Sequence, residues 1–114
     1  SWRLTTSELR IAPLAVLYTQ EAATALRRLR ARDRKALQAI KSMVGLISEY
    51  PATIGVELDG EWAGARRVHC ADDAYRIIWQ IDTEREAVVI LRVGKKTQRR
   101  KTVYEAPRPP WPPA

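Results

Sequence analysis

The sequence predicts an α+β fold, in which an N-terminal strand and an α-helical hairpin pack on a small antiparallel β-sheet. Two observations lead to this prediction. Apolar residues recur at helical spacing in the first half of the chain, and in the second half they alternate with polar residues in short runs. Helices followed by consecutive antiparallel strands are typical of the α+β class. The length of 114 residues corresponds to one domain.

The first half of the chain is expected to form a strand and two helices. Residues 14–19 are rich in β-formers, whereas residues 20–30 consist largely of Ala, Leu, Glu and Arg, which favour helix. Asp33 is suited to cap a second helix, which Pro51 ends. The buried face of this helix is predicted from the spacing of Leu37, Ile40, Val44 and Ile47. Two helices joined by so short a connection form an antiparallel hairpin.

Three strands are expected in the second half of the chain. Alternating runs span residues 65–70, 75–81 and 87–93, and Gly94 is expected to end the last of them. The connections are short and polar, with Asp72–Asp73 in the first of them. Consecutive strands with such tight turns form an antiparallel meander.

The middle strand carries an arginine among apolar residues. Its predicted core face consists of Tyr75, Ile77, Trp79 and Ile81. The opposite face consists of Arg76, Ile78 and Gln80. Arg76 therefore needs either a structural partner, for which Glu57 or Asp59 are candidates, or a functional one.

The two ends of the chain differ from its middle. Residues 1–13 show no clear period and are interpreted as an N-terminal arm, and residues 14–106 as the folded domain. Residues 107–114 are rich in proline and are expected to be extended and unpacked.

The charge of the chain favours a polyanionic partner. Lys and Arg number 20 against 13 Asp and Glu, a net charge of +7, which attracts nucleic acid or acidic proteins. The basic residues fall in two clusters. The first consists of Arg27, Arg28, Arg30, Arg32, Arg34 and Lys35. The second consists of Arg92, Lys95, Lys96, Arg99, Arg100 and Lys101.

Other features bear on the compartment of the protein. One cysteine, Cys70, allows no intrachain disulfide and fits the reducing cytoplasm. The apolar run from Ile11 to Tyr18 is too short to span a membrane. We therefore expect a cytoplasmic protein without a membrane partner.

Three stretches and one tyrosine carry a resemblance to a known family. They are GVELDGEWAGARRVH (55–69), AYRIIWQID (74–82) and AVVILRVGKK (87–96), followed by Tyr104. In order and spacing they resemble the RelE/ParE superfamily of toxins from bacterial type II toxin–antitoxin systems, in its RelE-like branch, over roughly residues 14–106. The resemblance implies a RelE-like fold and an endoribonuclease, an mRNA interferase, that cleaves messenger RNA in the ribosomal decoding site and inhibits translation. It also implies a cognate antitoxin as partner, and neither metal nor small-molecule cofactor.

The resemblance also assigns site residues. The catalytic positions of the RelE branch match Arg67, His69, Arg76, Lys96 and Tyr104. RNA contacts are expected from Lys95, Arg99, Arg100 and Lys101. The chain departs from the family where His69 replaces a lysine or arginine, where Lys96 replaces an arginine, and where a slightly longer segment precedes Tyr104.

The residues themselves agree with this set. Arg67 and His69 are two apart on a strand and face the same way, and Arg76 follows on the adjacent strand. A convergent cationic cluster repels itself unless an anion fills it, and a scissile phosphate is such an anion. The guanidinium of Arg76 could bind two phosphate oxygens at once.

Cleavage by side chains requires a base for the 2′-hydroxyl, an acid for the leaving 5′-oxygen and stabilisation of the added charge. His69 and Tyr104 are both candidates for the base, and the sequence leaves this choice open. Lys96 is a candidate for the acid, and with Arg67 and Arg76 it would stabilise charge.

His69 and Cys70 point to opposite sides of their strand, and the chain has no other His or Cys, so no metal site is expected.

Two other functions compete with RNA cleavage. A ParE-like toxin would bind DNA gyrase and perform no RNA chemistry, but such toxins usually lack the set of basic residues and tyrosine found here. A non-catalytic nucleic-acid-binding module would use the two basic clusters only to neutralise phosphates.

Overall fold

The computed structural model describes residues 13–95 and 107–113. Within this part the elements follow one another as β1 (Ala15–Tyr18), α2 (Gln20–Arg32), α3 (Arg34–Glu49), β2 (Val56–Glu57), a 3₁₀ turn (Gly60–Trp62), β3 (Ala65–Cys70), β4 (Tyr75–Asp82) and β5 (Ala87–Lys95). The helical hairpin and the α+β class are confirmed. Neither helix of the described part is long and apolar enough to cross a membrane.

The strands of the described part form one five-stranded sheet in the order β1-β5-β4-β3-β2. The expected meander of β3, β4 and β5 is antiparallel, whereas β1 pairs with β5 in parallel. The expected end of the last strand at Gly94 is wrong, because Gly94 pairs with Arg76 and Lys95 with Tyr75. A glycine keeps its backbone donor and acceptor, so it continues the ladder.

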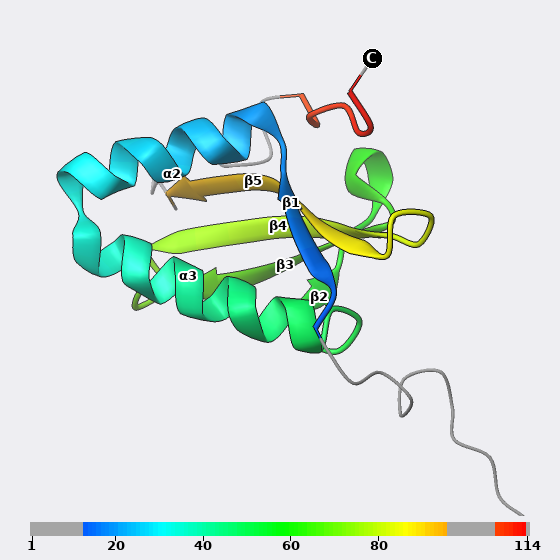
Figure 1. The fold of residues 1–114 in the computed structure, drawn as a ribbon, viewed down its shortest axis with the longest axis horizontal. Helices are drawn as coiled ribbons and strands as arrows, with labels where there is room; N and C mark the ends of the chain where they lie inside the picture. Colours follow the sequence, from blue (N-terminus) through cyan, green and yellow to red (C-terminus); the bar gives the residue numbers. More distant parts are fainter. Residues whose placement is uncertain (1–12, 96–106, 114) are drawn as a thin grey trace, which may run out of the picture.

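The two helices lie over one face of the sheet, as Figure 1 shows. Asp33 caps α3 as expected, since its carboxylate accepts a hydrogen bond from the Ala36 amide at 3.0 Å. Thr19 caps α2 and also donates to the carbonyl of Leu91 at 2.6 Å, which ties the start of the helix to β5. The core on this side joins both helices to the sheet through Ala22, Ile40, Val44, Ile47, Ile77, Trp79, Val88 and Ile90.

The opposite face of the sheet carries a second apolar cluster. It consists of Trp62, Ala65, Ile78, Val89 and Leu91. Burial of Ile77 and Trp79 on the predicted core face is confirmed, but Ile78 is equally buried on the other face. The expected burial of Ile81 is wrong, because Ile81 lies near the end of β4 and is 38% exposed. The middle of the sheet is therefore covered on both faces.

The expectation of an unpacked C-terminal tail is wrong for residues 107–113. The Arg108 guanidinium donates to the carbonyls of Glu61 and Ala63 at 3.2 and 2.8 Å, and to the Gln80 side chain at 2.8 Å. Trp111 packs against the second cluster and donates from Nε1 to Asp82 at 2.9 Å. Proline rings bury apolar surface without leaving backbone donors unpaired, so a Pro-rich segment can pack in this way. Figure 1 shows this segment in red, near the start of α2.

Candidate active site on the open face of the sheet

Two neighbouring strands place Arg67, His69 and Arg76 on the same face of the sheet. His69 on β3 lies directly opposite Arg76 on β4. The residues that alternate with them, Val68 and Ile77, pack into the core beneath the helices. The three site residues therefore lie on the face away from α2 and α3, and the expected convergence is observed for these three. Lys96, the fourth group expected there, lies outside the described residues.

One nitrogen of the imidazole is the point where the three side chains meet. Arg76 Nε donates to His69 Nε2 at 3.1 Å, and Arg67 Nη1 lies 3.4 Å from the same atom. The other ring nitrogen, Nδ1, contacts the carboxylate of Asp73. A guanidinium can only donate and a carboxylate can only accept, so Nδ1 carries the proton and Nε2 provides a lone pair. The imidazole is therefore neutral in this arrangement.

The cluster is accessible from outside. The His69 side chain is 37% exposed and that of Asp73 is 54% exposed. Arg67 Nε is buried and has no hydrogen-bond partner within the described residues. No three His, Cys, Asp or Glu side chains of the described ranges are gathered as metal ligands.

The turn between β3 and β4 brings the carboxylate of Asp73 to the imidazole. Ala71, Asp72 and Asp73 all have left-handed backbone, with φ of 54°, 56° and 67°. Such conformations are costly for residues other than glycine, although aspartate tolerates them better than most. Sequence reasoning treated Asp73 only as a turn residue. The signal that could have found it is its position four residues after the histidine, within a turn of two consecutive acids.

The structural alternative for Arg76, an ion pair with Glu57 or Asp59, is wrong, because Arg76 forms an ion pair with neither of them and donates to His69 instead. Glu57, which was a candidate partner, lies 3.5 Å from Arg66 instead. Arg66 also donates to the carbonyls of Ile54 and Gly55, both at 3.0 Å, so it holds the segment before β2 against the sheet. A Cβ on Gly55 would lie 2.0 Å from the Arg67 carbonyl oxygen, and its φ is +73°. Glycine is therefore required beside Arg67.

Arg92 does not belong to the surface cluster in which the sequence placed it. It is only 8% exposed, and its Nη2 donates to the Glu21 carboxylate and to the Pro107 carbonyl. A register shift between Ile78 and Trp79 interrupts the ladder between β4 and β5, and the Arg92 guanidinium lies 5.6 Å from the centre of the Trp62 ring. The interrupted alternation explains why local pattern did not predict its burial.

The remaining basic residues occupy different places. The first cluster is exposed on α2 and the start of α3, so it lies on the helical side and not beside the candidate site. Lys95 is exposed at the end of β5, opposite Tyr75. The other predicted site residues, Lys96, Arg99, Arg100, Lys101 and Tyr104, lie outside the described residues.

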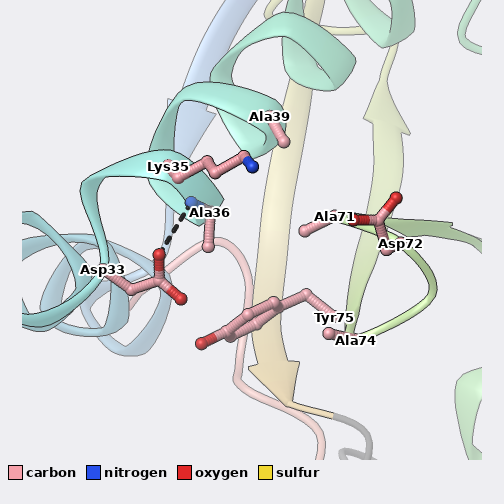
Figure 2. A pocket seen from close by; sticks show the side chains of 8 residues that line it. All are labelled: Asp33, Lys35, Ala36, Ala39, Ala71, Asp72, Ala74 and Tyr75. Atoms are coloured by element: carbon pink, nitrogen blue, oxygen red, sulfur yellow. Dashed lines mark hydrogen bonds between the residues drawn. The ribbon is translucent and has the colours of Figure 1, made fainter.

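A pocket of about 420 Å³ lies on the other side of the β3–β4 turn. Figure 2 shows the residues that line it, from the start of α3 and from the turn: Asp33, Lys35, Ala36, Ala39, Ala71, Asp72, Ala74 and Tyr75. Burial, and secondarily the charge of Asp33, raise the pKa of Tyr75 above its ordinary value of 10.0. The two acids of the turn thus have different surroundings, since Asp72 lines this pocket and Asp73 contacts His69.

The comparisons with known proteins place the chain among toxins of type II toxin–antitoxin systems. A family model described as the ParE toxin of the type II toxin–antitoxin system parDE matches residues 16–100. The chain belongs to this family, which lies within the RelE/ParE superfamily. The superfamily resemblance of the sequence is thereby confirmed. None of the curated proteins matches the chain.

Solved structures agree with this assignment. A chain of the toxin–antitoxin complex RelBE2 from Mycobacterium tuberculosis is 31% identical, with a TM-score of 0.63 over 75% of this chain and 100% of that chain. The Escherichia coli RelBE toxin–antitoxin complex gives 20% identity and a TM-score of 0.59 over 75% and 99%. A YoeB/ParE toxin from Agrobacterium tumefaciens gives 14% identity and a TM-score of 0.64 over 74% and 100%. The last two likenesses concern the fold alone.

Proposed function

We propose that this toxin cleaves messenger RNA on the ribosome. One observation carries the proposal: the guanidiniums of Arg67 and Arg76 both lie at Nε2 of His69, on an accessible face of the sheet. Arg67, His69 and Arg76 stand at positions to which the RelE resemblance assigns catalysis. The match to a ParE family model leaves the activity open, so the geometry of the site is the stronger guide.

The proposed reaction begins when a phosphate of the message enters the cluster. The guanidiniums of Arg67 and Arg76 turn from His69 Nε2 to the phosphate oxygens, which frees the lone pair of Nε2. His69 then takes the proton of the 2′-hydroxyl, and the 2′-oxygen attacks phosphorus. The bond from phosphorus to the 5′-oxygen breaks, and that oxygen receives a proton. The products are a 2′,3′-cyclic phosphate and a 5′-hydroxyl end.

The proton for the leaving oxygen is assigned to residues outside the described part. Lys96 remains the candidate acid, and Tyr104 the alternative base. His69 is favoured as the base because it is the group on which both arginines converge. A donor aimed at the charge that develops in the transition state lowers the barrier by roughly 3 kcal/mol, which raises the rate by about 10²–10³.

The proposed partner is a cognate antitoxin. Related solved structures are toxin–antitoxin complexes, which supports this partner. The exposed arginines of α2, which are Arg27, Arg28, Arg30 and Arg32, would attract an acidic segment that folds on the toxin.

The testing experiment uses purified toxin with translating ribosomes and a defined message. New 5′ ends are mapped for the wild type, His69→Gln, Arg76→Ala and the control Lys41→Ala, which removes an exposed charge from α3. We expect cuts within the decoding site for the wild type and the control, and strongly reduced cutting for the two site variants. Growth arrest by a wild type that produces no new ends would contradict the proposal.

The second candidate function is gyrase inhibition without RNA chemistry. The family model that matches the chain is that of ParE, which favours this alternative. It predicts loss of supercoiling by gyrase in the presence of the toxin, with intact message. It also predicts that Arg76→Ala still arrests growth, whereas the cleavage mechanism predicts that this variant is harmless.

A further inference from the structure

We infer that Asp73 is a positioning residue of this site, which orients His69 and balances the charge that His69 acquires. The inference rests on the proposed function. Asp73 does not belong to the set that the family resemblance assigns, and it lies at the opposite edge of the imidazole from the two arginines. It acts through the imidazole, whose Nδ1 it contacts.

The geometry around the ring supports an orienting role. The Asp73 carboxylate accepts the Nδ1 proton on one edge of the ring, and the donors of Arg76 and Arg67 meet Nε2 on the other. When a phosphate draws the two arginines away, His69 loses its contacts with Arg67 and Arg76 and keeps its contact with Asp73. It then keeps the proton on Nδ1 and leaves Nε2 as the acceptor for the 2′-hydroxyl proton.

The charges of the site require a nearby anion. Once Nε2 takes up a proton, the imidazole becomes a cation between Arg67 and Arg76. Like charges at such short separations repel, and a carboxylate in contact with the ring compensates for this repulsion. The negative charge of the phosphorane is paired with the two guanidiniums on one side of the ring, and the carboxylate of Asp73 is paired with the imidazolium on the other.

The backbone of the turn is shaped for this contact. Ala71, Asp72 and Asp73 all have left-handed backbone, which strains any residue other than glycine. Their effect is that Asp73 reaches back to the histidine four residues earlier, whereas Asp72 lines the pocket in Figure 2. The chain therefore offers a matched control, a second carboxylate in the same turn with the same backbone conformation.

The test compares Asp73→Gly with Asp72→Gly. Glycine suits φ of 67° and 56° alike, so both variants keep the turn and each loses one carboxylate. A third variant, Asp73→Asn, keeps an oxygen acceptor for the Nδ1 proton. The first readout is message cleavage on saturating ribosomes, with kcat and KM determined separately. The second readout is the nitrogen-15 spectrum of the imidazole, which is unambiguous because His69 is the one histidine of the chain.

A positioned proton-transfer group contributes about 10²–10⁴ in rate, and the loss of its orientation should remove part of this. We expect Asp73→Gly to lower kcat by about tenfold or more with KM nearly unchanged, Asp73→Asn to recover most of kcat, and Asp72→Gly to resemble the wild type. In the spectrum, the wild type should show a protonated Nδ1 and an unprotonated Nε2. Asp73→Gly should bring the two nitrogen resonances closer together as the tautomers exchange.

The outcomes separate the inference from the proposed function. An unchanged kcat in Asp73→Gly, or an equal loss in Asp72→Gly, overturns the positioning role while the wild type still cleaves. A wild type that does not cleave overturns the proposed function, and the spectrum then decides alone whether Asp73 orients the ring. Identical spectra of the wild type and Asp73→Gly would overturn the inference in that case.

Discussion

Arg76 and His69 lie directly opposite each other on β4 and β3, and Arg76 Nε donates to His69 Nε2 at 3.1 Å. They are therefore a donor and an acceptor, not two repelling cations. The sequence predicted a cluster whose repulsion only a bound anion could relieve. In the structure His69 accepts a hydrogen bond from Arg76 instead of repelling it, and the carboxylate of Asp73 adds a negative charge on the other edge of the ring.

The first prediction concerns Arg76. Arg76→Ala should lower message cleavage by about 10²–10³, because it removes a donor to the charged phosphorane. Arg76→Lys should recover little, since an ammonium cannot bind two phosphate oxygens in one plane. Single-turnover cleavage on isolated ribosome complexes measures both effects. Cleavage by Arg76→Ala at the rate of the Lys41→Ala control would remove Arg76 from the mechanism.

The same variant should fold normally. Arg76 is partly exposed and forms no ion pair with an acidic residue of the described ranges 13–95 and 107–113. Its removal should change the free energy of unfolding by no more than about 0.5 kcal/mol, as for most surface substitutions. Urea denaturation measures this, and a much larger loss would mean that reduced cleavage reflects unfolding.

The second prediction compares two glycines. Gly55→Ala places a Cβ 2.0 Å from the Arg67 carbonyl oxygen at a φ of +73°, whereas a Cβ on Gly45 meets nothing within 4 Å. We expect Gly55→Ala to destabilise the fold by roughly 1–3 kcal/mol and to impair cleavage through Arg67. Gly45→Ala lies within α3 and should stabilise the fold by roughly 0.5–1 kcal/mol. Equal unfolding midpoints for the two variants would contradict this account of Gly55.

The third prediction concerns the docked C-terminal segment. Arg108→Ala removes hydrogen bonds to Glu61, Ala63 and Gln80, of which the last is to a side chain of β4. We expect a loss of roughly 1–2 kcal/mol in the free energy of unfolding. Residues 107–113 should also become more sensitive to protease than in the wild type. Digestion followed by mass spectrometry gives the answer, and equal rates of cleavage within this segment would show that Arg108 does not anchor it.

The fourth prediction concerns acid. The hydrogen bond from Trp111, together with contacts from Arg85, lowers the pKa of Asp82 below its ordinary value of 3.8. A lowered pKa in the folded state means that the carboxylate stabilises the fold above the ordinary value, and that this contribution is lost as the pH falls through the folded value. The docked segment should therefore hold at neutral pH and loosen in strong acid.

Asp82→Asn provides the control for this acid effect. The stability difference between the wild type and Asp82→Asn should be constant at neutral and mildly acidic pH and shrink below about pH 4. Urea denaturation at a series of pH values measures the difference. A difference that grows on acidification would show that the sign is wrong.

Much of the fold could be predicted because it follows from local pattern. The β3 strand has the predicted bounds 65–70, and Asp33 caps α3 as its position before a helical run indicated. The meeting of Arg67, His69 and Arg76 also followed from simple alternation on two strands joined by a short turn. In each case the relevant residues are close in sequence.

The features that sequence reasoning missed depend on distant partners or on irregular backbone. Docking of Trp111 depends on Asp82, 29 residues away, and proline content alone says nothing of such a contact. Arg92 is buried where the ladder is interrupted, so alternation could not place it. Asp73 reaches the site through left-handed backbone, which no propensity predicts for consecutive non-glycine residues.

The position of β5 in the sheet has a consequence for folding during synthesis. This strand lies between β1 and β4 in the sheet, although it follows both in the chain. Thr19, which precedes α2, bonds Leu91 across 72 residues. During synthesis, β1 cannot pair with its partner β5 until Ala87–Lys95 has left the ribosome. The five-stranded sheet of the described part therefore cannot be completed until residue 95 has left the ribosome, and β1 and the helical hairpin emerge before their partner strand.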